Sequence, residues 1–394
     1  MILNLFKFYD MKHLFGLLMI VAFSCTVACA QSPFDKEGLS DSQMRDANID
    51  REEQLRLDVG EMLMVGFRGQ ELNEDNHIVR DILKYNVGGV ILFEYDAQLG
   101  KHGRNVVSPN QLKRLCGDLQ QLREETLLIG IDQEGGLVCR MKTKAGFDRV
   151  ISAEKMGKGG LDTVSKYARI TAKMLNEAGV NLNFAPCVDV NVNPNCPVIG
   201  KLGRSFSENP EIVGECALKW VETLNEWGII SCIKHFPGHG SSSKDSHHGL
   251  VDVTNSWKDS ELEPYRMLAK KVDMVMTTHV INGQIDADYP ATLSRTTIDM
   301  LRKDIGFEGV VVTDDMAMKA ITNQYGYEDA IKLAIEAGVD MLCLGNNGAE
   351  YNPEIVPETV NIIMELVKNG VVESEQIHAS AERIRHLKAK LGKR

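Results

Sequence analysis

Short runs of apolar residues recur along the chain, and in each of them the apolar residues follow one another without a regular polar alternation. Runs of four to eight residues rich in Val, Ile and Leu indicate strands that are buried on both faces, as in a parallel sheet. We therefore expect eight strands, and their runs are MLMVGF (62–67), GGVILF (88–93), LLIGID (127–132), VNLNFAP (180–186), IISCIKHF (229–236), MVMTTHV (274–280), GVVVTDD (309–315) and DMLCLG (340–345).

Amphipathic stretches separate the apolar runs. The clearest are residues 162–179 and 208–228, and both end in Gly, as helices often do. Strands that alternate with helices predict a parallel α/β fold, and eight such units favour a single (β/α)8 TIM-type barrel over residues 53–394. An open doubly wound sheet is the alternative. It is weakened because no glycine-rich phosphate loop follows the first strand.

The N-terminal residues have a different pattern. Residues 11–30 carry a basic residue at Lys12, continue as an apolar run and end in small residues around Cys29, which predicts a signal peptide over residues 1–30. A transmembrane anchor is the alternative, but the run is short for a span. Cys29 is also a candidate for lipid modification. We expect an exported protein, either periplasmic, secreted or anchored to the outer membrane as a lipoprotein, with residues 31–52 as a polar tether.

Charge and cysteine content exclude two classes of protein. The chain has 44 basic and 55 acidic residues, a formal net charge of −11, which argues against binding nucleic acid through bulk charge. The seven cysteines after Cys29 are odd in number and form no CxxC pair, so they are a poor disulfide framework. Cys187 and Cys196 are near enough in sequence to pair, but we predict no framework. The sequence does not define an oligomeric state.

Ionisable residues collect directly after the expected strands. A (β/α)8 barrel carries its chemistry at the C-terminal ends of its strands, so this placement is expected of a barrel enzyme. The residues concerned are Asp132 at the end of the third run and Glu134 just after it, Arg204 after the fourth, Lys234 and His235 in the fifth, His279 in the sixth, and Asp314 and Asp315 in the seventh.

The stretch KHFPGHGSSSKDSHHGL (234–250) combines histidines, lysines and an aspartate with many Gly and Ser residues. One alternative is a zinc site formed by His235, His239, Asp245, His247 and His248, and another is a solvated loop. The spacing of His235 and His239 is typical of zinc ligands, but the Pro-Gly pair between them prevents a continuous helix from presenting both rings. Asp245 and His247 favour another interpretation, in which the carboxylate orients the imidazole and raises its basicity. Such a pair can donate and then accept a proton near neutral pH.

Asp314 and Asp315 end a buried strand, where a charge is costly to desolvate without a purpose. The structural alternative is that one of them, Asp315 above all, caps the following helix. The functional alternatives for Asp314 are a nucleophile, a base or a metal ligand.

Asp132 and Glu134 have two interpretations as well. They are candidate buried partners for Arg140 and Arg204, or they bind a polyhydroxylated ligand through charge-assisted hydrogen bonds. The residues alone thus predict a barrel hydrolase that acts on a sugar or a similar polar substrate.

Four motifs occur in a fixed order: IDQEGGLVCR (131–140), GRSF (203–206), KHFPGHG followed by DSH (234–247), and VVVTDDMAM (310–318). Together they resemble the β-N-acetylglucosaminidases of glycoside hydrolase family 3, of the NagZ type, over residues 56–345. The resemblance implies a (β/α)8 barrel and a retaining double displacement that uses neither a metal nor another cofactor.

The resemblance also implies roles for individual residues. Asp314 corresponds to the nucleophile, His247 to the acid/base, and Asp245 to the residue that orients His247. The positions that hold the non-reducing sugar are Asp132, Arg140, Arg204, Lys234 and His235.

We accordingly expect an exo-acting enzyme that removes terminal N-acetylglucosamine from a β-linked oligosaccharide or a muropeptide. A phosphorylase, a β-glucosidase and a non-catalytic glycan-binding lipoprotein remain as alternatives. Two features depart from the family pattern. Leu137 stands where many relatives have arginine, and the expected signal peptide contrasts with cytoplasmic family members.

Overall fold

The computed structural model describes residues 41–245 and 249–392, and an eight-stranded parallel sheet forms its centre. Every strand of this sheet lies within one of the eight apolar runs, so the expected strands are confirmed. All of their side chains are buried, which explains why the runs lack polar alternation. The strands are β1 (Leu63–Gly66), β2 (Gly89–Leu92), β5 (Leu128–Ile131), β8 (Leu182–Asn183), β9 (Ile230–Phe236), β11 (Met274–Thr277), β13 (Val310–Val312) and β14 (Leu342–Leu344).

The two outer strands of the sheet meet each other. The spatial order is β13-β11-β9-β8-β5-β2-β1-β14, and Val312 of β13 forms a parallel bridge with Met341, just before β14. The amide of Thr313 donates to the carbonyl of Met341 at 3.0 Å, and the amide of Met341 donates to the carbonyl of Val311 at 3.1 Å. These contacts close the sheet into the expected (β/α)8 barrel and rule out the open doubly wound sheet.

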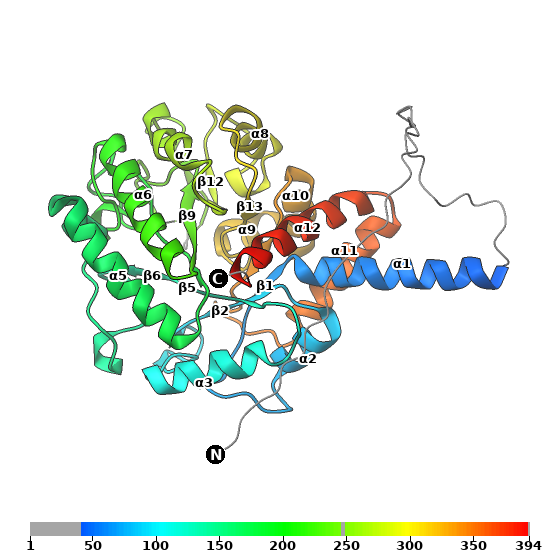
Figure 1. Cartoon of the computed structure of the whole chain (residues 1–394). Helices are drawn as coiled ribbons and strands as arrows, with labels where there is room; N and C mark the ends of the chain where they lie inside the picture. Colours follow the sequence, from blue (N-terminus) through cyan, green and yellow to red (C-terminus); the bar gives the residue numbers. More distant parts are fainter. Residues whose placement is uncertain (1–40, 246–248, 393–394) are drawn as a thin grey trace, which may run out of the picture. The chain divides into compact units, whose positions relative to one another are not determined.

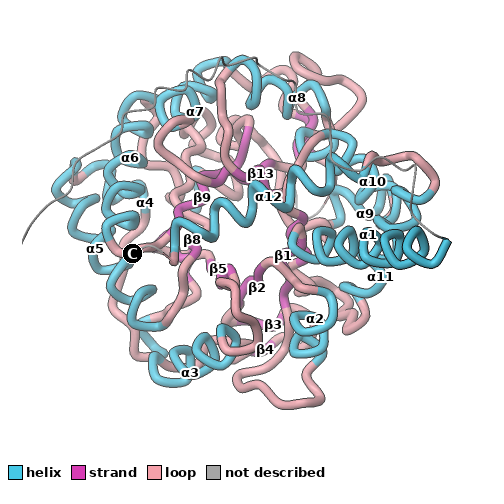
Figure 2. Tube along the Cα trace, turned by 45° about the vertical axis from the view of Figure 1, so that its right-hand side comes forward, coloured by secondary structure: helices cyan, strands magenta, loops and turns pink. Residues whose placement is uncertain are grey.

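Helices lie around the outside of the strands (Figures 1 and 2). The two expected helices are present as α5, which ends at the left-handed Gly179, and α6, whose N-cap Asn209 accepts from the amide of Glu211. The helices are α1 (Asp41–Glu61), α2 (His77–Tyr85), α3 (Pro109–Gln120), α4 (Ala153–Lys158), α5 (Gly160–Ala178), α6 (Pro210–Glu226), α7 (Glu263–Leu268), α8 (Arg295–Asp299), α9 (Lys319–Tyr325), α10 (Tyr327–Ala337), α11 (Ile355–Lys368) and α12 (Ser374–Leu391).

Several short strands lie in the connections. They form three small two-stranded sheets outside the barrel. These strands are β3 (Tyr95–Asp96) with β4 (Lys101–His102), β6 (Gln133–Gly135) with β7 (Val138–Cys139), and β10 (Val251–Asp252) with β12 (Val280–Ile281).

Residues 49–394 form one compact unit, which carries the barrel. The last part of the expected tether, residues 41–52, is helical as the beginning of α1. The expected signal peptide, residues 1–30, lies outside the described residues. Within the described ranges, no helix combines the length and the apolar character that a membrane span requires.

Glycines on neighbouring strands make room for large side chains inside the barrel. A Cβ atom on Gly130 of β5 would lie 2.7 Å from the ring of Phe184, and one on Gly89 of β2 would lie 2.6 Å from the terminal methyl group of Met64. Phe184 and Met64 are themselves fully buried. The barrel interior is therefore a packed core, as is usual for (β/α)8 barrels, and a ligand can bind only above it.

A buried carboxylate joins the closing seam of the barrel to the surrounding helices. Asp340, 1% exposed, precedes β14. Its Oδ2 accepts from the amide of Val311 at 2.7 Å and from Arg302 at 2.5 Å, while its Oδ1 accepts from Ser380 at 3.2 Å and from Arg383. Four donors thus converge on one carboxylate at the N-terminal end of the strands.

Replacement of this carboxylate tests its structural role. We expect Asp340→Ala to lower the free energy of unfolding by about 3 kcal/mol, because it leaves two guanidinium groups and a buried amide without their acceptor. Urea denaturation measures the change. Asp299→Ala is the matched control, since Asp299 forms an exposed pair with Lys303, and it should cost less than about 1 kcal/mol. Equal losses in the two variants would contradict the assignment.

Candidate active site

A cavity of about 550 Å³ opens at the C-terminal ends of the barrel strands. Its lining residues come from segments spread between Ile91 and Asn347, as the barrel interpretation expects. The acid/base candidate His247 lies outside the described residues. The remaining seven expected site residues all line the cavity: Asp132, Arg140, Arg204, Lys234, His235, Asp245 and Asp314.

Lys234 is the central cation of the cavity floor. Its Nζ lies 2.7 Å from Oδ1 of Asp132 and 2.8 Å from Oε1 of Glu134. Burial acts to lower the pKa of Lys234, but the two carboxylates outweigh burial and raise this pKa above its ordinary value. The ammonium group therefore stays charged, and it joins the end of β9 to the residues that follow β5.

Two arginines complete the network. Arg204 binds Glu134 with two hydrogen bonds of 2.8 and 2.7 Å, and Nη2 of Arg140 donates to Oδ2 of Asp132 at 3.0 Å. Burial acts to raise the pKa of both acids, but the neighbouring cations lower each pKa below its ordinary value. The expected ion pairs are confirmed. Because Asp132, Arg140 and Arg204 also line the cavity, their ligand-binding role stays a prediction.

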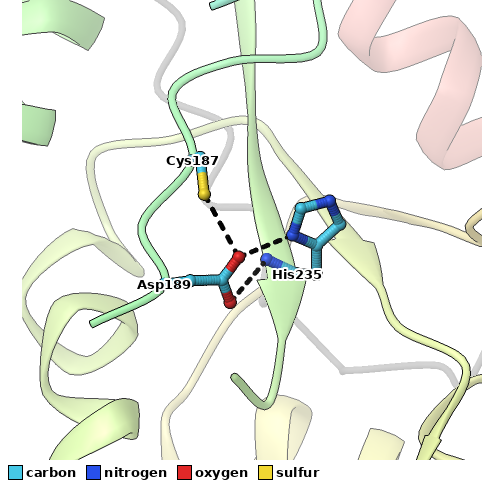
Figure 3. A group of neighbouring side chains, drawn as sticks. All are labelled: Cys187, Asp189 and His235. Carbon is cyan, nitrogen blue, oxygen red and sulfur yellow. Dashed lines mark hydrogen bonds and ion pairs between the residues drawn. The ribbon is translucent and has the colours of Figure 1, made fainter. Parts of the chain in front are cut away.

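The buried carboxylate of Asp189 holds His235 in place, as Figure 3 shows. Oδ2 of Asp189 lies 2.6 Å from Nδ1 of His235, and Oδ1 accepts from the amide of His239 at 2.7 Å. On the other side of the ring, Nη2 of Arg204 lies 3.3 Å from Nε2 of His235. A guanidinium only donates, so Nε2 accepts and Nδ1 carries the proton.

Sequence reasoning missed Asp189. The signal was available, because Asp189 follows the fourth apolar run closely, and Asp132 and Asp314 lie at the ends of theirs.

Cys187, Asp189 and His235 are the group of described residues whose donor atoms lie close enough to hold a metal, within 4.8 Å of one another (Figure 3). The thiol of Cys187 donates to Oδ2 of Asp189 at 3.1 Å. Burial, and then the charge of Asp189, raise the pKa of this thiol well above its ordinary value. Metal binding needs a thiolate and an unprotonated ring nitrogen. The cluster is thus explained by hydrogen bonds that orient His235, and we assign it no metal.

His239 lies in the loop that follows β9, but it is buried and does not lie at the surface. It is 3% exposed, its Nδ1 lies 2.8 Å from Oγ of Ser242, and burial lowers its pKa to about 4. The loop turns inward because the carbonyl of Gly240 accepts from the amide of Asn193 at 3.0 Å. The backbone also passes so close to Val190 that a Cβ atom on Gly240 would lie 1.8 Å from its carbonyl oxygen.

Asp314 and Asp315 have different surroundings. Oδ1 of Asp315 accepts from the amides of Ala317 at 3.0 Å and Gly345 at 2.9 Å. The capping interpretation is wrong, because the following helix α9 has Met318 as its N-cap, without a side-chain cap bond. Oδ1 of Asp314 accepts from the amide of Asp315 at 2.8 Å. His279, expected at the barrel mouth, is instead buried and donates to the carbonyl of Asp315 at 3.0 Å. Asp314 is therefore the better candidate for chemistry.

Leu137 lies in the β6–β7 hairpin, and its side chain is 68% exposed. Val138, the next residue, lines the cavity instead. The leucine at this position therefore leaves the ion-pair network of the cavity floor intact.

Glu261 is a fully buried carboxyl group under the loop that leads to Asp245. Gly238, with a φ of +127°, crosses it so closely that a Cβ atom there would lie 2.9 Å from Oε2 of Glu261. The indole of Trp257 donates to the carbonyl of Pro237 at 3.1 Å and holds the same loop. Burial raises the pKa of Glu261 to about 7, and the Ser241 hydroxyl offsets only part of this effect.

This raised pKa predicts a pH dependence of stability. The folded protein holds the Glu261 proton more tightly than the unfolded chain, so stability is highest below the ordinary glutamate pKa and falls as the pH rises towards 7. Each unit of pKa shift corresponds to 1.36 kcal/mol, so the free energy of unfolding falls by about 3 kcal/mol over this pH range. Thermal melts between pH 4.5 and 8 should show it in the wild type.

The matched variants are Glu261→Gln, which should remove this part of the pH dependence, and Glu263→Gln, an exposed neighbour that should leave it unchanged. Parallel pH profiles of the melting temperature for the wild type and Glu261→Gln would contradict the assignment.

The fold and the cavity define a class of protein. A (β/α)8 barrel with carboxylates, guanidinium groups and an ammonium group at the C-terminal ends of its strands is a barrel enzyme suited to a polar, hydroxyl-bearing ligand. Residues 54–387 match the family described as "Glycosyl hydrolase family 3 N terminal domain". The chain belongs to glycoside hydrolase family 3 and is a glycoside hydrolase.

Curated relatives and solved structures agree with this family. A β-hexosaminidase of Neisseria meningitidis serogroup C (strain 053442) is 36% identical over 285 residues, which are 69% of this chain and 73% of the relative. The family 3 β-N-acetylglucosaminidase of Paenibacillus sp. str. FPU-7 matches with a TM-score of 0.77 and 34% identity, over 86% of this chain and 62% of that one. This chain therefore spans less than two thirds of the Paenibacillus enzyme.

A further solved structure is matched over nearly its whole length. The β-N-acetylhexosaminidase of Beutenbergia cavernae DSM 12333 matches with a TM-score of 0.76 and 27% identity, over 85% of this chain and 98% of that one.

Proposed function

We propose that the protein is a retaining exo-β-N-acetylglucosaminidase, which hydrolyses terminal non-reducing N-acetylglucosamine from peptidoglycan fragments or other β-linked glycans. The observation that carries the proposal is that Asp314 and Asp245, from two distant segments, line the same cavity above the Lys234 network. The choice of sugar rests on the names of the relatives, which are β-hexosaminidases and β-N-acetylglucosaminidases.

The proposed reaction has two steps. Asp314 attacks the anomeric carbon and forms a glycosyl-enzyme, while His247, oriented by Asp245, gives its proton to the leaving oxygen. His247 then takes a proton from water, which attacks the same carbon and releases the sugar with retained configuration. The role of His247 rests on its motif in the sequence.

Lys234 is suited to bind a hydroxyl group of the sugar. An ammonium group has three N–H donors, and among the described residues Asp132 and Glu134 account for two of them. The third donor is available to a ligand that enters the cavity. Arg140, whose side chain is 24% exposed, can bind a second hydroxyl in the same way.

The charge of the cavity supports hydrolysis over phosphorolysis. An excess of acidic groups opposes the entry of an anion such as phosphate, whereas water carries no such penalty. Of the described residues that line the cavity, five are acidic and three are basic: Glu94, Asp132, Asp245, Asp314 and Asp315 against Arg140, Arg204 and Lys234.

A glycan-binding protein without activity and a β-glucosidase have less support. Binding alone needs neither the Asp314 carboxylate nor the Asp245–His247 pair, and a glucosidase fits the names of the relatives less well. The apolar run and the small residues around Cys29 support a further proposal, that the enzyme is exported and is either cleaved or lipid-modified there.

The nucleophile is tested by Asp314→Ala with an activated aryl β-N-acetylglucosaminide. We expect kcat to fall about 10⁴-fold. Added azide should restore turnover and give the α-glycosyl azide, because the small anion occupies the space of the missing carboxylate. Product analysis by NMR identifies the anomer. Asp315→Asn is the control, and it should lose less activity, since Asp315 binds backbone amides. The reverse order of losses would assign the nucleophile to Asp315.

The second step is tested by the product formed in phosphate buffer. We expect free N-acetylglucosamine, and no sugar 1-phosphate, from the wild type with or without phosphate. Chromatography of the products measures both species. Sugar 1-phosphate as the main product would show that the cavity accepts an anion and that the enzyme is a phosphorylase.

A further inference from the structure

The β3–β4 hairpin leaves the barrel just after β2 and returns to nearly the same point. At its base, the amide of Phe93 donates to Oδ1 of Asn105 at 3.0 Å, and the amide of Asn105 donates to the carbonyl of Phe93 at 2.8 Å. One step further out, the amide of Gly103 donates to the carbonyl of Glu94 at 2.7 Å. Residues 94–104 therefore form a hairpin whose two ends are hydrogen-bonded to each other. The hairpin can present a side chain to the cavity without any change in the barrel.

The hairpin is held against the loop that follows β14. Asn347 accepts from the amide of Ala97 at 3.0 Å and donates to the carbonyl of Tyr95 at 3.0 Å. Buried Asp96 accepts from Arg104 at 2.8 Å and from Arg68 at 2.7 Å. A segment held by charge-assisted bonds on both sides is already ordered before a ligand arrives, so binding costs little ordering entropy.

This fixed hairpin places an aromatic ring on the cavity. Tyr95 lines the cavity and is 39% exposed. Its ring meets that of His102 edge-on, with the centroids 5.1 Å apart, which limits the rotation of the side chain. Apolar side chains from two further segments, Val138 and Leu202, line the same cavity.

The cavity thus combines two surfaces of different chemistry. Charged groups around Lys234 suit the hydroxyls of a sugar, whereas an exposed tyrosine ring and two aliphatic side chains suit the C–H face of a pyranose. An exo-acting glycosidase that cleaves an oligosaccharide holds two sugars, one on each side of the bond that it cleaves.

We propose that Tyr95, with the fixed β3–β4 hairpin, forms the binding site for the aglycone, where its ring packs against the pyranose of the sugar that leaves. This proposal rests on the proposed function, because only a glycosidase has an aglycone to bind. It assigns the preference for an oligosaccharide over a simple glycoside to a residue outside the catalytic groups.

The test compares Tyr95→Ala and Tyr95→Phe on two substrates. Methyl β-N-acetylglucosaminide has no ring in its aglycone, while N,N′-diacetylchitobiose has a full pyranose. We expect Tyr95→Ala to lower kcat/KM for diacetylchitobiose about tenfold, mainly through KM, and to change that for the methyl glycoside less than twofold. Tyr95→Phe keeps the ring and should stay within about threefold of the wild type on both substrates.

A tyrosine away from the cavity provides the control. Tyr289 is 37% exposed and packs on Tyr325, so Tyr289→Ala should leave both substrates unaffected. A melting temperature near that of the wild type shows that each variant is folded.

The outcomes separate the two proposals. Equal losses on both substrates, or no loss on either, would overturn the aglycone site while the glycosidase stands. A wild type that hydrolyses neither substrate would overturn the proposed activity and the aglycone site with it.

Discussion

The ammonium group of Lys234 is the interaction on which the cavity depends. Asp132 and Glu134 lie only two positions apart, Glu134 buried and Asp132 with 13% of its side chain exposed. Without a shared cation their charges would repel each other in a medium of low dielectric constant. Lys234 approaches both carboxylates within 2.8 Å, and Arg204 extends the network from Glu134 to His235. One cation therefore joins β9 to the residues that follow β5 and balances the charge of the floor. Arg204 and Asp189 fix the tautomer of His235, which lines the cavity.

Much of the fold and the site could be predicted from the sequence. Strands buried on both faces leave an apolar run that is hard to mistake, and all eight were located. Barrel geometry then places the C-terminal ends of the strands around one opening, which is why Asp132, Lys234 and Asp314 could be grouped from sequence alone. The ion pairs of Arg140 and Arg204 were expected only as one of two alternatives, since sequence shows charge but not partners.

The remaining features depend on tertiary burial, which local sequence does not encode. His239 lies in a Gly- and Ser-rich segment that is typical of a surface loop, yet Asp189 and Asn193, from the preceding unit, draw this segment inward. Glu261 lies in an acidic segment that is typical of an exposed turn, and it is nevertheless covered by Gly238. The β3–β4 hairpin was missed because two-residue strands leave no periodic pattern.

The anchoring of the loop at Ser242 limits how far Asp245 can travel. The carbonyl of Ser242 accepts from the side chain of Asn193 at 2.8 Å, so the chain is fixed at that point. Asp245 lies three residues further on, and three extended residues span at most about 10 Å. Asp245 is thus connected by a short segment to a fixed point of the chain. Any rearrangement of the Asp245 backbone during turnover therefore takes place about Ser242, and it keeps residue 245 within about 10 Å of that point.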